Sequence, residues 1–223
     1  MKEWKNYITG LIKKYNMLIP LKPVLEKYDI KLNGVVHVGA HWAEEHDDYI
    51  DCGLKEFLYV EPIKEAFEVL VQRFAGNPSV KLENVAIGSK EDVGVMCVDT
   101  TNQGQSNSLL EPFVHLEQHS EVIFNGDPQV VKIVTLDSIE FPTWYNLFMV
   151  DTQGYELEVL KGSKNVLPQF DLLYLEVNRQ ETYKGCPMVE ELDEFLLPFG
   201  FHRVETKWAS HYHSWGDAIW IKK

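Results

Sequence analysis

The segment Gly34-Val35-Val36-His37-Val38-Gly39-Ala40 decides the fold class of this chain. Its apolar residues occupy consecutive positions, which is typical of a strand buried on both faces of a parallel sheet. The glycine that follows the strand predicts a tight turn at its carboxyl end. The segment therefore predicts an α/β protein built on a buried, mostly parallel sheet.

Strands and helices alternate on the carboxyl side of this segment. We predict a helix over 44–53, a strand over 57–60, a helix over 63–74 and a third strand over 80–87. The alternation resumes with a strand over 147–150, a helix over 155–162, a strand over 172–177 and a helix over 189–197. Two closing strands, 201–206 and 217–221, predict a terminal antiparallel hairpin. This order indicates a doubly wound, Rossmann-like sheet with right-handed crossovers.

Two parts of the chain depart from the alternation. Residues 1–33 are predicted to form an N-terminal helical extension, with two short amphipathic helices over 3–28 separated near Pro20 and Pro23. Within the main domain, 34–223, residues at about 93–135 are predicted to form an antiparallel insertion, with strands at 93–98 and 130–134. The insertion carries a polar stretch over 99–108, and long irregular connections of this kind are more often functional than not.

Composition excludes several classes of protein. The chain has 223 residues and a net charge of −13, and this negative field disfavours nonspecific binding to nucleic acids or anionic membrane surfaces. No apolar run approaches the roughly 20 residues that span a bilayer, and the N-terminus lacks the pattern of a signal peptide. The three cysteines form no CxxC pair and favour reduced thiols. These features predict a cytoplasmic protein.

A glycine and an acid follow the first two predicted strands. Gly39-Ala40 ends the first strand, and Glu61 ends the second strand 22 residues later. In doubly wound folds glycine lets a ligand approach the backbone, and such an acid accepts hydrogen bonds from ribose hydroxyls. The spacing suits an adenosine-containing cofactor, but it equally allows Gly39 to make only a tight turn and Glu61 to cap the next helix.

The missing glycines narrow the choice of cofactor. GxGxxG is absent because His41-Trp42-Ala43 follow the glycine turn, which disfavours NAD and FAD. GxxxxGK[ST] is also absent, which excludes a P-loop kinase or NTPase. A cofactor with ribose and adenine but no phosphate is S-adenosylmethionine.

The second half of the chain contains the most specific pattern, DxxGxExxxLKG over 151–162. An acid at the end of a buried strand, a glycine turn and a helix would place Asp151 beside Gly39 at one sheet edge. At this point the sequence resembles the FkbM family of S-adenosylmethionine-dependent methyltransferases, from about Val35 to Lys222. Other matching stretches lie at 37–41, 60–62, 84–86, 105–110, 135–137, 175–178, 200–201 and 215–217.

The resemblance implies a class I methyltransferase fold of seven strands with a reversed final hairpin. It implies S-adenosylmethionine as cofactor and O-methylation of a hydroxyl of a small molecule, such as a sugar or secondary metabolite. The residues implied to bind the cofactor are His37, Gly39, Ala40, His41, Glu45, Glu61, Pro62, Asn84, Val85, Ala86, Ser106, Ser108 and Asp151. Of these, Glu61 would hold the ribose, residues 84–86 would flank the adenine, and the two serines would close over the methionine portion.

Two positions depart from the family pattern. His37 stands where the family usually has an acid on the first strand, and Ala43 stands where a glycine is common. Glu45 is the candidate substitute for the missing acid.

Catalysis of methyl transfer to an alcohol depends on placing the acceptor oxygen in line and removing its proton. We predict Asp151 as the base or acceptor-orienting group, with Glu176 and Asn178 at the end of the next strand in the same cleft. Glu156 could bind substrate or cofactor, or it could cap its own helix.

The histidines give weaker signals. His115 and His119 have helical spacing but lack the acid of HExxH, so no metal site is predicted. His211 and His213, near Trp208, Tyr212 and Trp215, are expected in a loop at the mouth of the cleft. The alternatives that remain are an NAD-dependent oxidoreductase and a non-catalytic module that binds an adenosine ligand. The oligomeric state is left open.

Overall fold

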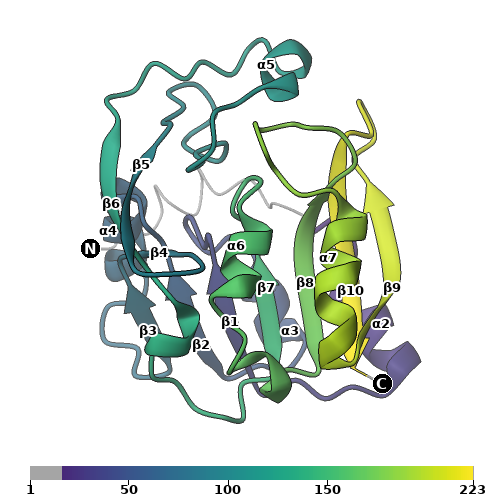
Figure 1. The fold of residues 1–223 in the computed structure, drawn as a ribbon. Coiled ribbons are helices and arrows are strands. Elements are labelled where there is room, and N and C mark those ends of the chain that lie inside the picture. Colours follow the sequence, from purple (N-terminus) through teal and green to yellow (C-terminus); the bar gives the residue numbers. More distant parts are fainter. Residues whose placement is uncertain (1–16, 223) are drawn as a thin grey trace.

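A seven-stranded sheet forms the centre of the computed structural model, which describes residues 17–222 (Figure 1). Its strand order is β3-β2-β1-β7-β8-β10-β9. The strands are β1 (Gly34–Val38), β2 (Glu56–Val60), β3 (Val80–Glu83), β7 (Leu147–Val150), β8 (Leu172–Asn178), β9 (Phe201–Trp208) and β10 (Trp215–Lys222). The first five pair in parallel, and β10 lies antiparallel to both β8 and β9. This confirms the predicted sheet and its reversed terminal hairpin.

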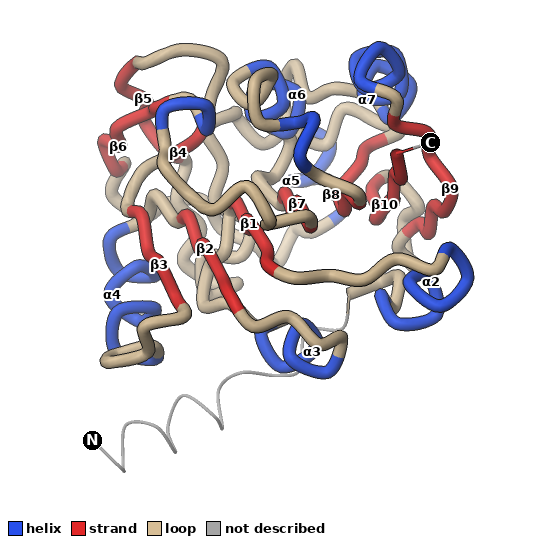
Figure 2. Tube along the Cα trace, turned by 90° about the horizontal axis from the view of Figure 1, so that it is seen from below, coloured by secondary structure: helices blue, strands red, loops and turns tan. Residues whose placement is uncertain are grey.

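Helices cover both faces of this sheet, as the view from below shows (Figure 2). One face packs against α6 (Glu156–Lys161) and α7 (Val189–Leu196), and the other packs against α2 (Leu21–Tyr28), α3 (His46–Asp51) and α4 (Lys64–Arg73). Val36 and Val38 belong to the first core, whereas Val35 belongs to the second. Every residue of β1, β7 and β8 is buried, which explains why these strands are apolar at consecutive positions.

A second, three-stranded sheet lies beside the large one, with the order β4-β6-β5. It consists of β4 (Ala86–Ile87), β5 (Asp92–Met96) and β6 (Gln129–Val134). The predicted single strand over 80–87 is therefore wrong, because the chain leaves the large sheet after Glu83 and enters the small one at Ala86. Within the predicted insertion β5 and β6 pair antiparallel, as predicted, and β6 also pairs in parallel with β4, which precedes the insertion.

The remaining elements are short. The insertion holds one short helix, α5 (Val114–Gln118), and single 3-10 turns occur at η1 (Leu136–Ser138), η2 (Leu167–Gln169) and η3 (Leu197–Phe199). The predicted helix over 44–53 is shorter, because Ala43 has a positive φ of 55° and the helix starts only at His46. The first predicted N-terminal helix lies outside the described residues. Within 17–222 no helix combines the length and apolarity that crossing a bilayer requires.

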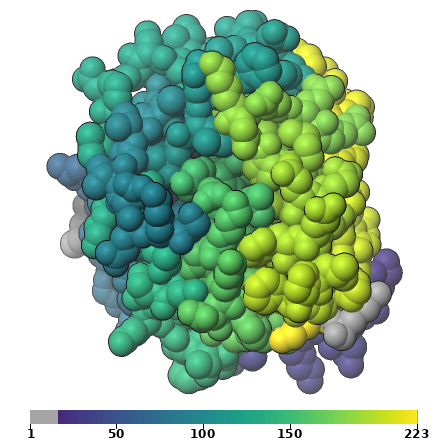
Figure 3. Space-filling view, viewed as in Figure 1, coloured from purple at the N-terminus to yellow at the C-terminus, as the bar shows by residue number. Residues whose placement is uncertain are grey.

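The small sheet is held against the centre of the large one. A β-carbon on Gly162, at the end of α6, would stand 1.9 Å from the main-chain oxygen of Gly88, just after β4. In the space-filling view the teal atoms of the insertion lie directly against the green atoms of this central region (Figure 3). The glycine that ends the pattern over 151–162 therefore permits close contact between the end of α6 and the small sheet.

Candidate functional site

Three strand ends meet at one edge of the large sheet. In the sheet register Val38 is paired with Val60 on one side and with Val150 on the other, so Gly39, Glu61 and Asp151 follow at adjacent positions. The amide of Gly39 donates to the Val60 oxygen, and the amide of Asp151 donates to the Val38 oxygen. The parallel sheet thus brings together residues that are far apart in the sequence, as their positions at strand ends predict.

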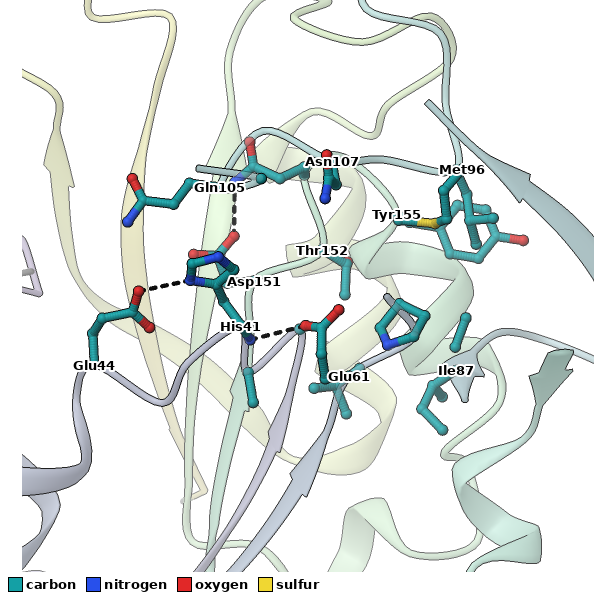
Figure 4. A pocket seen from close by; sticks show the side chains of 18 of the residues that line it. His41, Glu44, Glu61, Ile87, Met96, Gln105, Asn107, Asp151, Thr152 and Tyr155 are labelled. Carbon is teal, nitrogen blue, oxygen red and sulfur yellow. Dashed lines mark hydrogen bonds and ion pairs between the residues drawn. The ribbon is translucent and has the colours of Figure 1, made fainter. Parts of the chain in front are cut away.

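A pocket opens at this edge (Figure 4). One end is apolar and the other is acidic, with Glu61 between them in the close-up view. The apolar end is lined by Pro62, Ala86, Ile87, Met96, Leu109 and Tyr155, and the acidic end by Glu44, Glu45 and Asp151. Gly104, Gln105 and Asn107, from the polar stretch of the insertion, complete the lining.

The predicted site residues divide between this pocket and its surroundings. Those that line the pocket are Gly39, Ala40, His41, Glu45, Glu61, Pro62, Ala86 and Asp151. Those that do not are His37, Asn84, Val85, Ser106, Ser108, Glu176 and Asn178. Two of the second group, Ser106 and Glu176, line a neighbouring cavity instead.

Glu61 is buried, and its carboxylate organises the backbone around it. Oε2 accepts the amide of His41 at 2.9 Å, and Oε1 accepts the amide of Ile63 at 2.8 Å, just before α4. Burial raises the pKa of Glu61, and the charge of His41 opposes that shift. Each carboxylate oxygen has a further lone pair, so the capping role and a ligand-binding role are compatible.

The turn after β1 is held in an unusual conformation by an ion pair. His41 has a positive φ of 43°, and its Nδ1 lies 2.6 Å from Glu44 Oε1. Its Nε2 lies 2.9 Å from the carbonyl oxygen of Gln103 in the insertion. Burial lowers the pKa of His41, but the hydrogen bond and charge of Glu44 outweigh it and raise the pKa to about 9. A protonated His41 therefore ties the insertion to the turn beside the pocket.

Gln153 separates the pocket from the neighbouring cavity and lines both. Its amide nitrogen donates to Asp151 Oδ1 at 2.8 Å and to Glu176 Oε2 at 2.9 Å, and its oxygen accepts from the Tyr183 hydroxyl at 2.9 Å. Burial raises the pKa of Asp151. Burial and then the charge of Asp151 raise the pKa of Glu176 well above its ordinary value. Gln153 therefore bridges the carboxyl group that follows β7 and the one near the end of β8.

The neighbouring cavity is polar and partly aromatic. Its lining consists of Thr101, Asn102, Gln105, Ser106, His115, His119, Glu121, Val122, Gln153, Glu176, Thr182, Tyr183 and Trp215. No lysine or arginine is among these lining residues. The Tyr212 ring, from the loop between β9 and β10, contacts the His119 ring at 5.4 Å between centroids, so this loop borders the cavity as predicted. His211 and His213 do not line it, and residues 17–222 contain no group of three histidine, cysteine or acidic side chains that could hold a metal ion.

Four other candidates make structural hydrogen bonds. Glu156 Oε1 accepts from the Thr152 amide, the Thr152 hydroxyl and the Gly154 amide, so it caps the turn before α6. Asn84 donates to the carbonyl oxygens of Glu61 and Pro62. Ser108 donates to the Gln153 carbonyl oxygen, and Asn178 accepts from Thr182.

Sequence reasoning missed several lining residues. Gln153 lies two positions after Asp151 within the pattern over 151–162, so its place at a strand end was a usable signal. Glu44 lies four positions after Ala40, at the start of the predicted helix over 44–53. Met96 lies on β5 of the small sheet and Leu109 lies between β5 and β6, and no sequence signal connected these two residues to the pocket.

The sequence matches one protein family, and the fold resembles that of several solved structures. The family described as "Methyltransferase FkbM domain" matches residues 37–203, and no curated protein sequence matches the chain. Among solved structures, a protein assigned as an S-adenosylmethionine-dependent methyltransferase from Listeria monocytogenes has a TM-score of 0.53 at 12% identity, covering 89% of this chain and 96% of that one. Magnesium protoporphyrin IX methyltransferase from Synechocystis, with bound S-adenosylmethionine, has a TM-score of 0.50 at 8% identity, covering 90% and 74%.

A protein assigned as a tRNA methyltransferase from Streptococcus pneumoniae, in complex with S-adenosylmethionine, also has a TM-score of 0.50, at 11% identity and with 90% and 72% covered. At these sequence identities the similar structures establish only the fold. The family model, by contrast, matches the sequence itself over most of the chain.

Proposed function

This chain belongs to the FkbM methyltransferase family, and from that premise we propose that it methylates a hydroxyl oxygen of a small hydroxylated acceptor, such as a sugar or secondary metabolite. Its class, an S-adenosylmethionine-dependent methyltransferase, follows from the family. The acceptor, the position of the donor and the roles of the individual residues are the proposal.

The proposal rests on the pocket at the ends of β1, β2 and β7, which is apolar at one end and acidic at the other. We call it the donor pocket. An adenine fits the apolar end between Ile87, Met96 and Tyr155. Glu61 stands where the ribose hydroxyls would follow, and the acidic end would receive the positively charged methionine portion. Gly39 and Asp151 line the pocket side by side, so the ends of β1 and β7 both face a ligand bound there.

Asp151 is the proposed base. S-adenosylmethionine, when bound, supplies a methyl group on a sulfonium leaving group, so the protein has only to orient the acceptor hydroxyl and take its proton. Burial raises the pKa of Asp151 toward neutral pH, and a base whose pKa lies nearer the working pH is better suited to take the proton. Gln153 would hold the carboxylate in place through the hydrogen bond to Oδ1.

The neighbouring cavity is the proposed acceptor site. It shares Gln105 and Gln153 with the donor pocket, so an acceptor there would lie next to the methyl group. Hydroxyl, amide and carboxyl side chains line it together with aromatic rings, a combination that suits a hydroxylated ring. The absence of lysine and arginine from the lining and the net charge of −13 favour an uncharged acceptor over RNA, the substrate class of one of the structurally similar proteins.

A two-part experiment tests the proposal. Calorimetry should give binding of S-adenosylmethionine and S-adenosylhomocysteine and none of NAD. Transfer of a labelled methyl group should then be screened against hydroxylated glycans, hydroxylated small metabolites and RNA. Label in a base-stable ether on a small acceptor would support the proposal, whereas label only in RNA, or no turnover with any acceptor despite donor binding, would contradict it.

A further inference from the structure

The first sheet strand carries no negative charge toward the donor pocket. His37, the titratable residue of β1, is buried, and the Tyr49 hydroxyl lies 3.1 Å from its Nδ1. Burial lowers the pKa of His37 to about 3, although the charge of Glu44 opposes this shift. His37 is therefore neutral at physiological pH. A cationic ligand group that approached this strand end would need a carboxylate from elsewhere.

Glu45 places a carboxyl group at that position. Its Oε2 lies 3.9 Å from His37 Nδ1, and the residue is 7% exposed and lines the donor pocket. Within residues 17–222 no lysine or arginine forms an ion pair with it, and the paired histidine is the neutral His37. Glu44 is different, because His41 already neutralises it. Glu45 is thus a buried acid with no positively charged ion-pair partner among residues 17–222.

The charges around Glu45 favour the binding of a cation beside its carboxyl group. Burial, then the charges of Glu44 and Asp151, raise its pKa to about 8, and His41 opposes that shift only weakly. The titratable and charged groups that face it come from five elements or their ends: His37, His41, Glu44, Tyr49, Tyr59, Asp151 and Tyr174. Of these groups only His41 is positively charged, and it is already paired with Glu44.

We propose that Glu45 binds the α-ammonium group of the methionine portion of the donor, in place of an acid on β1. The inference rests on the placement of the donor in this pocket. The ammonium is the one fixed cation common to S-adenosylmethionine and S-adenosylhomocysteine. A hydrogen bond between charged groups that is removed from water is worth enough to make a difference of about tenfold or more in affinity.

The decisive comparison uses two ligands that differ only at the methionine end. S-adenosylhomocysteine carries the ammonium, whereas 5′-methylthioadenosine has the same nucleoside and sulfur but no amino acid. Glu45→Gln should weaken the first by about tenfold or more and change the second by less than about twofold. Glu194→Gln, which also removes one carboxylate but lies exposed on α7, is the matched control and should change neither.

A second measurement compares the two ligands on the natural protein. Because an arriving ammonium stabilises the ionised form of Glu45, binding near pH 7 should release a proton, with about one proton as the upper limit. Calorimetry in buffers of different ionisation enthalpy counts this release. It should accompany S-adenosylhomocysteine but not 5′-methylthioadenosine, and it should disappear in Glu45→Gln.

The outcomes separate this inference from the proposed function. Equal weakening of both ligands by Glu45→Gln, or no weakening of either, would overturn the role of Glu45 while leaving donor binding intact. If the variant does not fold, equal proton release by the two ligands in the natural protein would also overturn it. Failure of the natural protein to bind either ligand would instead remove the donor pocket itself.

Discussion

A β-carbon on Gly39 would stand 1.7 Å from the main-chain oxygen of Asp151. The backbone that follows β7 therefore leaves no room for a side chain at position 39, at the end of β1. Gly39 also has a positive φ of 79°, a conformation that side chains disfavour. Contact and conformation thus both require glycine.

Gly39→Ala should destabilise the protein strongly, by about 3 kcal/mol or more, because the Asp151 backbone cannot move without breaking the sheet. Gly53→Ala is the matched control: its φ is also positive, at 89°, but nothing lies within 4 Å of the added carbon. It should cost only about 1–2 kcal/mol. Urea unfolding measures both, and equal costs would mean that the contact with Asp151 has no energetic importance.

Asp151→Asn should lower turnover with an identified acceptor by about 100-fold or more, since the amide cannot take the hydroxyl proton. The affinity for S-adenosylhomocysteine should change by less than about fivefold, because the proposed placement gives the nucleoside its contacts with Glu61 and the apolar end. Single-turnover kinetics and calorimetry give the two values. Unchanged turnover would exclude Asp151 as the base.

Gln153→Leu should shift the pH dependence of turnover. The Gln153 amide lowers the pKa of Asp151 against the larger effect of burial, so its loss leaves that pKa higher. A base with a higher pKa becomes active only at higher pH. The acid limb of the kcat/KM profile should therefore move to higher pH, and a limb that stays in place would contradict the hydrogen-bond role of Gln153.

Glu156 should prove important for stability and not for chemistry. Glu156→Ala leaves three donors of residues 152 and 154 without their acceptor and should cost about 3 kcal/mol. Glu156→Gln keeps an acceptor oxygen and should cost less than about 1 kcal/mol. Chemical unfolding tests the stabilities, and large loss of turnover in a stable Glu156→Gln protein would contradict a purely structural role.

The thermal stability of the free protein should fall as the pH rises from about 6.5 to about 9. Burial raises the pKa of Glu45 from 4.5 to about 8, and that of Glu156 to about 7. Against the effect of burial, Glu44 raises the pKa of His41 from 6.5 to about 9. A group with a raised pKa holds its proton more tightly in the folded state, so its stabilisation is lost as the pH rises through the folded pKa. The buried histidines with lowered pKa values act only at pH below their ordinary value of 6.5.

Unfolding temperatures across this pH range check the expectation, and a constant or rising value would contradict it. Saturating S-adenosylhomocysteine should make the decline shallower if it supplies the cation that Glu45 lacks.

The sequence was informative wherever a strand is buried on both faces. Val35 to Val38 and Leu147 to Val150 are apolar at every position except His37, which made their ends, Gly39 and Asp151, recognisable. Parallel pairing then required those ends to meet. The central half of the site was predictable for this reason.

The part that escaped prediction depends on contacts between distant segments. Val80 to Ile87 has no break that marks a change of sheet, because both halves suit a strand equally well. The apolar end of the pocket requires Met96 and Tyr155 to meet across the two sheets, and nothing in either local sequence specifies that contact. The three-way hydrogen bonding of Gln153 likewise exists only once β7, β8 and the chain after β8 are assembled.

Because the chain leaves the large sheet after β3 and enters the small sheet at β4, the walls of the donor pocket come from two separate sheets. The acidic end stands on the large sheet, whereas Ile87 and Met96 stand on the small one. The segment between β5 and β6 also supplies residues 101, 102, 105 and 106 to the neighbouring cavity. A change in the length of this segment would therefore alter that cavity without breaking a hydrogen bond between the seven strands. Under the proposed function, acceptor specificity can change in this way while Gly39, Glu61 and Asp151 keep their places on the large sheet.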